Sequence, residues 1–405
     1  MTASGPDEAR QLMLAAVEPL AGELVALSDA VGRTLRSAVV ATRAQPPFAA
    51  SSMDGWAIRD ADLDPKARLT IVGESAAGAA FDGVLSAGQA VRISTGAPLP
   101  VGADRVVPQE EADREGAWVS MTRARAGDAR FIRSAGLDYT AGATLLKAGV
   151  RLDPWSVALA AAAGLPELEV SRRARVRVVT LGDEIVRPGA LPGPSQIFDA
   201  AADALCALIV AWGGEAERTG PVADDRAVLA DALASTGEDL LVTVGGASVG
   251  DHDLVKPVLK QAGLVLWVEG INVRPGRPTW FGVMPDGRRV LGLPGNPASA
   301  LVCATLFLEP LLNAFHGVHD NGLGWRSARL AIPLPPNGPR EHYLRAALRS
   351  GPDGVWLAEP FEDQDSSRLM IFAAANGLLR RLPGADAAPP GEVVQVLALP
   401  RIQAA

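Results

Sequence analysis

The chain has 405 residues, which is too long for a single hydrophobic core, and we expect two to four domains. Its net charge of -8 argues against nucleic acid or an anionic membrane as the main partner, so an anionic ligand needs a local basic patch. The two cysteines, Cys206 and Cys303, are too few for a disulfide framework or a thiolate metal site, and we expect both to fill space in a core.

The N-terminal stretch MTASGPDEAR lacks the basic and apolar regions of a signal peptide. No apolar run approaches the roughly 20 residues that cross a bilayer, so we expect a cytoplasmic protein with reduced thiols. Residues 7–35 then carry apolar positions at helical spacing, which predicts a helix there. These positions are Leu12, Met13, Val17, Leu20, Leu24, Leu27 and Val31.

Residues 45–150 change to short apolar runs between glycines and prolines, which indicates a β-rich region. The strand-like runs are RLTIVG, QAVRIS, DRVVPQ, AWVSMT and ATLLKAG. The next segment, PWSVALAAAAGL, predicts a helix, because Pro154 suits its first turn and Gly164 suits its end.

From about residue 175 strand-like and helical patterns alternate. The strands are RVRVVTLG, EDLLVTVGG and the start of RVLGLPGNPASAL; the helices are DAAADALCALIVAWGG, RAVLADALAST, LVKPVLKQAG and the long segment that ends at Phe315. This alternation predicts an α/β domain with a parallel sheet covered by helices. After about residue 320 the chain is again β-rich, in ARLAIPLP, HYLRAALRS, GVWLAEP and EVVQVLAL.

Two acidic motifs follow strands of the predicted α/β domain. Gly182-Asp183-Glu184 follows the first strand, and GGASVGDHD, residues 245–253, follows a central one. Ligands of such sheets bind beyond the carboxyl ends of the strands. The glycines of the second motif suit an anion and its acids suit a cation, so we expect a cation that bridges carboxylates and phosphates. An ordinary solvated turn is the alternative for each motif.

Two further stretches suit an anion. In NVRPGRPTWFG, Arg274 and Arg277 flank a Pro-Gly turn, and two guanidiniums on a rigid turn can bind a tetrahedral oxyanion. In GLPGNPASAL, Asn296 suits the N-cap and Pro297 the first position of a helix, whose free N–H groups attract anions. Solvated arginines and a purely structural cap are the alternatives.

The β-rich region places polar residues near glycines: Asp54 in SSMDGWAI, Thr95 in RISTGAPLP and Asp138 in IRSAGLDYTAG. Each can also be a turn residue that hydrogen-bonds its own backbone. The residues alone therefore predict an α/β domain with a polyanion pocket, carboxylates for Mg²⁺ and flanking β domains. They do not define a reaction.

Together these motifs resemble the MoeA-type molybdopterin molybdenumtransferase family, which is related to the C-terminal domain of gephyrin. The resemblance follows the order of the chain and also covers RISTGAPLPVGADRVVPQE, GDEIVRPG, GGASVGDHDLVK, RPGRP, REHYLRAAL and QDSSRL with ANGLL. It implies an elongated homodimer with its active site between subunits. The implied substrates are adenylylated molybdopterin and molybdate, and a Mg²⁺-dependent step releases AMP and molybdenum cofactor. Contact with cofactor-biosynthesis or acceptor proteins is a further expectation, and nucleic acid and membranes are not expected.

The resemblance also implies four domains. A helical connector is formed by two stretches, 1–45 and 146–172, and a β-rich domain, 46–145, is inserted between them. An α/β molybdopterin-binding domain, 173–320, and a C-terminal β domain, 321–405, follow.

Roles for single residues come from the same resemblance. The implied catalytic residues are Asp54, Thr95, Asp138, Glu184 and Asp253, of which Glu184 and Asp253 also serve Mg²⁺. The implied substrate-binding residues are Asp224, Gly245, Gly246, Ser248, Gly250, Pro294, Gly295, Asn296 and Pro297. The implied molybdate ligands are Arg274, Arg277, Ser299, Arg345 and Ser367.

The chain departs from the family pattern at several ligand positions. Hydroxyl or amine side chains of the family are replaced or displaced at Leu181, Val244, Gly270 and Asp199-Ala200-Ala201, and two family lysines are Arg274 and Arg277. These changes leave an alternative open, a catalytically weak paralogue that binds pterin or a partner protein. A third option is another nucleotide-cleaving enzyme with the same α/β domain, which the N-terminal β motifs oppose.

Overall fold

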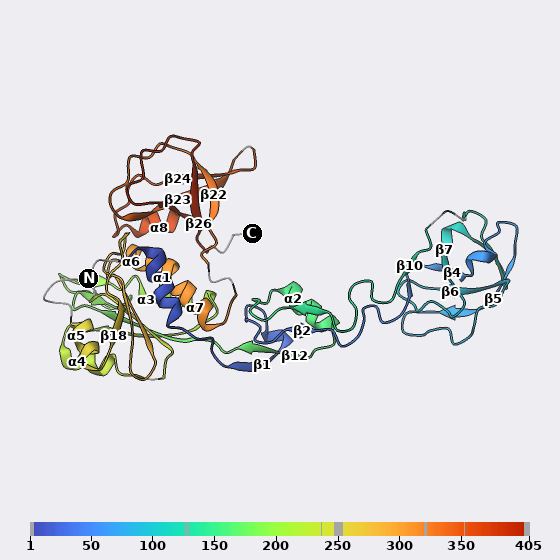
Figure 1. Ribbon diagram of the computed structural model, residues 1–405, viewed down its shortest axis with the longest axis horizontal. Helices are drawn as coiled ribbons and strands as arrows, with labels where there is room; N and C mark the ends of the chain where they lie inside the picture. Colours follow the sequence, from blue (N-terminus) through green and yellow to red (C-terminus); the bar gives the residue numbers. More distant parts are fainter. Residues whose placement is uncertain are drawn as a thin grey trace.

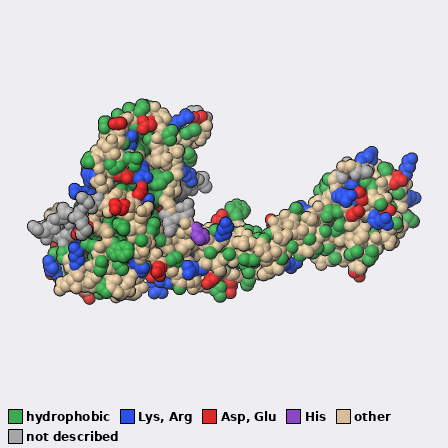
Figure 2. Space-filling view, viewed as in Figure 1, with side chains coloured by type: hydrophobic (Ala, Val, Ile, Leu, Met, Phe, Trp, Pro, Cys, Tyr) green, Lys and Arg blue, Asp and Glu red, His purple; other side chains and the backbone are tan. Residues whose placement is uncertain are grey.

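The computed structural model describes residues 4–400, except 126, 128, 236, 247–253, 320–321 and 352. Four bodies form an L, with a C-terminal β body standing on an α/β body and a narrow connector leading to a second β body at the far end (Figure 1). Figure 2 shows the same outline as a solid surface, with an open inner angle between the C-terminal body and the connector. The predicted multidomain α/β plus β architecture is confirmed, whereas the domain boundaries stay a prediction.

The connector is built from two separated stretches of chain. Its elements are β1 (Gly22–Ala26), η1 (Leu27–Asp29), β2 (Val39–Val40), β11 (Thr144–Leu146), α2 (Pro154–Ala162) and β12 (Glu167–Ser171). β1 pairs antiparallel with β12, and β2 pairs antiparallel with β11. The predicted helix after Asp153 is confirmed as α2, and the Asp153 carboxylate caps it by accepting a hydrogen bond from the Ser156 N–H at 2.7 Å.

The predicted helix over residues 7–35 is wrong beyond residue 15. Only α1 (Pro6–Ala15) is helical, and its buried residues Ala9 and Met13 pack into the core of the α/β body. The helix ends ahead of Pro19, which disfavours helical backbone before it, and from Gly22 the chain pairs with β12 as a strand. Leu24, one of the positions at helical spacing, is 69% exposed.

The β body at the far end of the connector is inserted between its two stretches. Its elements are β3 (Ala50–Ser51), β4 (Gly55–Ile58), η2 (Asp60–Asp62), β5 (Leu69–Ser75), β6 (Gln89–Ile93), β7 (Arg105–Pro108), η3 (Gln109–Glu111), β8 (Asp113–Glu115), β9 (Trp118–Ser120) and β10 (Ile132–Arg133). One sheet has the strand order β7-β4-β6-β5-β9-β8. The residue after Asp54 has to be a glycine, because a Cβ at position 55 would overlap the Val107 carbonyl oxygen on β7.

The α/β body contains the second six-stranded sheet. Its elements are β13 (Arg175–Leu181), β14 (Ile185–Val186), β15 (Ile197–Phe198), α3 (Ala202–Ala211), β16 (Glu215–Val222), α4 (Arg226–Ala232), β17 (Leu240–Val244), α5 (Val255–Gln261), β18 (Val265–Val268), β20 (Trp280–Val283), β21 (Arg289–Leu293), α6 (Pro297–Cys303), η4 (Ala304–Leu308) and α7 (Glu309–Phe315). The strand order is β16-β13-β17-β21-β20-β18. β16, β13, β17 and β21 are parallel, and β20 and β18 continue the sheet antiparallel. The carboxyl ends of the four parallel strands therefore share one edge.

One continuous helix, Pro297–Phe315, runs through α6, η4 and α7. It has 19 residues and a mean hydropathy of 1.6, so its length and composition would allow it to cross a membrane. This corrects the sequence-based statement that no apolar run is long enough. In the folded chain 89% of its apolar window is buried, and Phe307 and Leu311 belong to the main hydrophobic core. Its apolar character is accounted for by that core.

The C-terminal β body is a closed barrel. Its elements are β19 (Val273–Arg274), β22 (Arg326–Leu330), β23 (Glu341–Ser350), β24 (Trp356–Pro360), α8 (Leu369–Ala374), β25 (Gly377–Arg381) and β26 (Val393–Ala398). The strand order is β19-β23-β24-β22-β26-β25, and β23 also pairs with β25, which closes the ring. β19 pairs with β23 of the barrel, although it comes just before β20 of the α/β sheet in the chain. The segment from β19 to β20 therefore joins the two bodies.

Buried charged groups lie where the connector meets the α/β body. Arg151 donates to the Trp212 carbonyl, and His316 Nε2 accepts a hydrogen bond from the Ala174 N–H at 3.2 Å. Burial raises the pKa of Glu309 to about 7, although Arg151 opposes this rise. Burial, with help from Arg151, lowers the pKa of His316 to about 4. The folded junction therefore favours a protonated Glu309 and a neutral His316.

We expect Glu309→Gln to remove part of the loss of stability that occurs as the pH rises from about 4.5 to about 7. Between the ordinary pKa of 4.5 and about 7, the unfolded chain releases a proton that the folded chain retains, so rising pH lowers the free energy of unfolding. The variant should nearly match the wild type at pH 5 and exceed it by about 1–3 kcal/mol at pH 8. Thermal unfolding at both pH values measures this, with Glu217→Gln at an exposed position of β16 as control. An equal gain at both pH values would contradict the assignment.

Candidate functional site

A cavity of about 1090 Å³ opens at the carboxyl ends of β13, β17 and β21. Its lining includes Leu181, Val244 and Gly295, which end or follow these three strands, and it extends to Trp267 of β18. This edge of an open α/β sheet is where ligands bind, because the loops that leave parallel strands diverge there. The predicted position of a binding site beyond the strand ends is therefore matched by a cavity.

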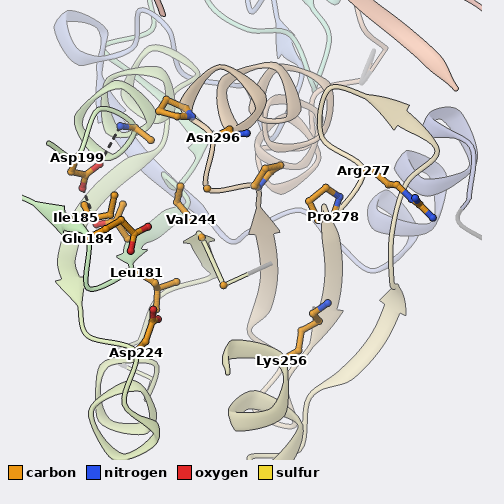
Figure 3. A pocket seen from close by; sticks show the side chains of 18 of the residues that line it. Leu181, Glu184, Ile185, Asp199, Asp224, Val244, Lys256, Arg277, Pro278 and Asn296 are labelled. Carbon is orange, nitrogen blue, oxygen red and sulfur yellow. Dashed lines mark hydrogen bonds between the residues drawn. The ribbon is translucent and has the colours of Figure 1, made fainter. Parts of the chain in front are cut away.

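The acidic wall of the cavity follows β13. Glu184 and Asp224 both line it (Figure 3). The Asp224 N–H donates to the Asp183 carboxylate at 3.2 Å. Gly182 has φ +133°, and an added Cβ there would overlap the Glu184 carboxylate, so the glycine makes room for that side chain. The Ile197 N–H donates a hydrogen bond to the Glu184 carbonyl at 2.7 Å, which fixes the backbone of Glu184. No described residue hydrogen-bonds the exposed Glu184 carboxylate, which leaves it available to a ligand.

Asp199, beside this wall, has a structural role instead. It is buried, and its carboxylate, labelled in Figure 3, accepts a hydrogen bond from Thr180 Oγ1 at 2.8 Å. It also accepts from Arg218 at 3.0 Å. The same carboxylate accepts from the Ala202 N–H at 3.0 Å, at the start of α3. The acid that survives in the Asp199-Ala200-Ala201 motif therefore stabilises the local fold.

Glycines form the floor between β17 and β21. Gly245 has φ +91° and an added Cβ would lie 2.8 Å from the Leu181 carbonyl oxygen, so no other residue fits without strain. Gly295 lies directly against Gly245, since a Cβ added at Gly295 would be 3.4 Å from the Gly245 Cα. The predicted substrate-binding residues that line this cavity are Asp224, Gly245, Gly246, Pro294, Gly295, Asn296 and Pro297. Ser248, Gly250 and Asp253 lie outside the described residues.

Asn296 occupies the N-cap position of α6 and Pro297 its first turn, as predicted. The Asn296 side chain makes no capping hydrogen bond, however. Its Nδ2 instead donates to Ser366 Oγ of the C-terminal barrel at 3.0 Å. The start of α6 thus faces the cavity while its cap residue reaches into another body.

The opposite wall of the cavity carries two basic residues, and a third acid, Glu269, also lines the cavity. Arg277 and Lys256 line it, across the cavity from Glu184 and Asp224 (Figure 3). Lys256 was missed by the sequence analysis, although it follows the glycine motif in the first turn of α5. Arg277 ends a turn in which Gly276, at φ +110°, packs closely against Cys303. No side chain fits at this position, since an added Cβ would overlap the Cys303 sulfur. Cys303 is a free, buried cysteine that fills space in the core, as expected, and its sulfur packs against the backbone of this turn.

The other predicted molybdate ligands lie outside the cavity lining. Arg274, in β19, is exposed, and Ser299, in α6, is buried. Arg345 is fully buried in β23, and its Nη2 donates to the Asp365 carbonyl at 3.0 Å. Among the described residues its Nε and Nη1 have no partner, so three N–H groups of the guanidinium are left without an acceptor. Burial lowers the pKa of Arg345, and Arg274 contributes in the same direction.

The sequence analysis also missed His342, which lies in the same strand, β23. Its Nε2 is buried without a partner among the described residues. Burial and the charges of Arg274, Arg345 and Arg340 lower its pKa to about 4, so the imidazole is neutral at pH 7. His342 aligns with Arg274 in the parallel pairing of β19 with β23. The C-terminal barrel therefore presents a cluster of basic groups near its junction with the α/β body.

The polar residues of the inserted β body are far from the cavity within one chain. Asp54 accepts hydrogen bonds from the Thr95 N–H at 2.6 Å and from Thr95 Oγ1 at 2.9 Å, and these bonds lower its pKa. Both residues are exposed, and they adjoin β4 and β6, which lie in the body at the far end of the connector (Figure 1). Asp138 lies in the chain that returns to the connector and lines a separate, open cavity of about 510 Å³ with Tyr139. The chain thus brings Asp54 and Thr95 together, but not with Glu184.

No group of three or more potential metal-ligating His, Cys, Asp or Glu side chains occurs within the described part of the chain. A cation held by a ring of protein ligands is therefore not seen there. A cation held by one or two carboxylates together with a ligand's own oxygens needs no such group.

Comparison with known families covers most of the chain. Residues 5–164 match the family described as MoeA N-terminal region (domain I and II), and residues 177–314 match a probable molybdopterin binding domain. Residues 327–399 match the MoeA C-terminal region (domain IV). The three matches follow the order of the motifs in the sequence.

Individual relatives are similar over nearly their full length. A molybdopterin molybdenumtransferase of Nostoc sp. is 34% identical over 393 residues, which cover 93% of this chain and 89% of the relative. A protein of the same name from Synechococcus elongatus is 36% identical, with 96% and 98% covered. The crystal structure of a molybdopterin biosynthesis MoeA protein from Pyrococcus horikoshii superposes with a TM-score of 0.82 at 30% identity, covering 98% of this chain and 99% of that one.

Proposed function

The chain belongs to the MoeA family of molybdopterin molybdenumtransferases, and on this premise we propose that it inserts molybdate into adenylylated molybdopterin with release of AMP. The observation that carries the proposal is a cavity at the carboxyl ends of the α/β strands, with Glu184 and Asp224 on one side and Arg277 and Lys256 on the other. Its volume of about 1090 Å³ suits a ligand as large as a pterin nucleotide. We place this step of molybdenum cofactor biosynthesis in the cytoplasm.

The phosphates of such a ligand fit the glycine floor and the basic wall. Gly245 and Gly246 let the backbone approach a phosphate closely, and the free N–H groups at the start of α6 favour negative charge. Arg277 and Lys256 add positive charge in a protein whose net charge of -8 opposes anions. These residues bind and orient the phosphoanhydride that water cleaves, giving AMP and the pterin phosphate.

Mg²⁺ fits the acidic wall. Proteins usually hold this ion with one or two carboxylates and leave its other positions to water and substrate phosphates. The free Glu184 carboxylate supplies one such ligand, and we propose Asp253 as the second. When bound, Mg²⁺ neutralises charge on the phosphoryl oxygens and so assists cleavage of the phosphoanhydride.

Molybdate is a substrate with a different need, several fixed donors around a tetrahedral dianion. We propose Arg274, Arg277, Ser299, Arg345 and Ser367 for this task. The strongest support is Arg345, because a fully buried guanidinium with two nitrogens that lack a described partner suits an oxyanion that supplies acceptors. Ser367 Oγ donates to the Asp365 carboxylate at 2.6 Å, so molybdate would have to compete for that hydroxyl.

We further propose that the working unit is a homodimer in which Asp54, Thr95 and Asp138 meet the cavity of the partner subunit. The support is that Asp54 and Thr95 lie at the end of the molecule opposite the α/β body, across an open inner angle (Figures 1 and 2). A second copy can fill that angle. Within one chain, the inserted β body would have to move across the angle to bring its residues to the cavity.

Mixing two inactive variants tests this arrangement. Asp54→Ala and Glu184→Ala chains should each lose most AMP release, and their mixture, refolded together, should regain about a quarter of the wild-type rate, because half of the dimers are mixed and each has one intact site. Co-refolding two copies of the same variant is the control. A monomer by light scattering at micromolar concentration, or a mixture no more active than its parts, would end the idea.

The alternative of a catalytically weak paralogue has its own observation. Leu181 and Val244 bring apolar side chains to the lining of the cavity, and both are 4% exposed. Hydroxyl contacts to a ligand are lost there, so the alternative expects binding of the adenylylated pterin with little turnover.

One assay separates the two functions. Purified protein is incubated with adenylylated molybdopterin, Mg²⁺ and molybdate, and released AMP is measured. The transferase should release AMP in many turnovers, and only when both Mg²⁺ and molybdate are present. Binding without AMP release would favour the paralogue, and no binding at all would contradict both.

A further inference from the structure

The loop that precedes α8 of the C-terminal barrel is the observed link between the cavity and the buried Arg345. This loop, residues 361–368, leaves β24 and passes the start of α6. Ser366 Oγ accepts the hydrogen bond from Asn296 Nδ2 at 3.0 Å. Asn296 itself lines the cavity, so a ligand there lies one side chain away from the loop.

Internal hydrogen bonds brace the loop. The Asp365 N–H donates to the Asp363 carboxylate at 2.8 Å. The Ser367 N–H and Oγ both donate to the Asp365 carboxylate, at 2.8 and 2.6 Å. Because Ser366 lies between these tied residues, its position and the position of the Asp365 carbonyl cannot change independently.

The same loop holds Arg345 in place. The Arg345 N–H donates to Gln364 Oε1 at 2.9 Å, and Gln364 Nε2 donates back to the Arg345 carbonyl at 3.0 Å. The Arg345 guanidinium makes one hydrogen bond within the described chain, from Nη2 to the Asp365 carbonyl at 3.0 Å. Its orientation therefore depends on the carbonyl of the residue next to Ser366.

We propose that Ser366 is a positioning residue, which couples occupation of the cavity to the orientation of Arg345 through Asn296 and Asp365. The inference rests on the proposed function, since it treats the cavity as the nucleotide site and Arg345 as an oxyanion donor. A ligand that fixes Asn296 also fixes Ser366, and the braced loop carries that constraint to Arg345. Nucleotide and oxyanion then bind with positive coupling, which by linkage acts equally in both directions.

The coupling predicts a specific defect in Ser366→Ala. A hydrogen bond of ordinary strength corresponds to about a fivefold change in an equilibrium constant. In the wild type, AMP should tighten molybdate binding about fivefold or more, as measured by calorimetry with and without AMP. In Ser366→Ala the two molybdate affinities should become equal, while AMP binds alone as in the wild type. Ser366→Thr, which keeps the hydroxyl, should restore the coupling.

Ser327→Ala provides the matched control, because Ser327 is an exposed serine of the same barrel, and its Oγ accepts a hydrogen bond from Gln395 Nε2 at 3.4 Å. It should keep the wild-type coupling. Full coupling in Ser366→Ala, or an equal loss in Ser327→Ala, would overturn the role of Ser366 while leaving the proposed function intact. A wild type that binds neither AMP nor molybdate would overturn both.

Discussion

Glu184→Gln is expected to lower the rate of AMP release by about 10²-fold or more while the protein remains folded. The Glu184 carboxylate faces the cavity, lies above Gly182 and has no described partner, so glutamine keeps its size and removes only its charge. If this charge holds Mg²⁺ against the phosphates, its loss also raises the Mg²⁺ concentration needed for half-maximal activity. Measuring AMP release over a Mg²⁺ series separates these two effects.

Glu217→Gln is the control for this variant, because Glu217 is an exposed carboxylate of the neighbouring strand β16. It should leave both the rate and the Mg²⁺ dependence unchanged. Near-normal turnover in Glu184→Gln would remove Glu184 from the chemistry. A reduced rate with unchanged Mg²⁺ dependence would keep Glu184 at the site but assign the ion to other acids.

Apolar patterning predicted the α/β body because strands buried on both faces leave continuous apolar runs. LLVTV forms β17, which is buried at every residue, and its neighbours are parallel as predicted. The edge of the sheet was not predicted. β16, with the sequence EAERTGPV, is half-exposed and too polar to show a strand pattern, and β18 and β20 are only four residues each.

The prediction of a helix over residues 7–35 failed because a helical pattern was present where the chain forms a strand. Spacing in threes and fours was present, but part of it came from residues on a paired and largely exposed strand, such as Leu24 in β1. Periodicity reports where apolar residues recur and cannot show which partner strand competes for the backbone. That partner, β12, comes about 145 residues later in the chain.

For the site, the sequence predicted which strand ends carry ligands, because glycines and acids after buried strands leave a visible pattern. It could not predict what single side chains do there. Asp199, in a motif where the chain departs from the family pattern, is held by Thr180 and Arg218. Asn296, predicted as an N-cap, makes no capping hydrogen bond and donates to Ser366 instead. Such roles depend on residues far away in sequence, and local patterns do not contain them.

Arg345→Met should stabilise the protein and at the same time weaken molybdate binding about 100-fold. The buried guanidinium has two nitrogens, Nε and Nη1, with no described partner, and a buried polar group costs about 1–3 kcal/mol when it is left unsatisfied. Methionine has a similar length and fills the space without polar groups, so the free energy of unfolding should rise by about 1–3 kcal/mol. The same N–H groups are the donors that an oxyanion needs, and two charge-assisted hydrogen bonds are enough for the expected loss of affinity.

Thermal unfolding and molybdate titration of the same variant test both halves of this argument. Arg349→Met, at an exposed position of the same strand, is the control and should change neither property. A variant that is less stable than the wild type would mean that Arg345 serves the fold, for instance through the nearby Asp363 and Asp365. A variant that is more stable but binds molybdate normally would place the oxyanion elsewhere. The expected combination of higher stability and lost binding would indicate that the chain keeps an unsatisfied buried charge because its ligand completes it.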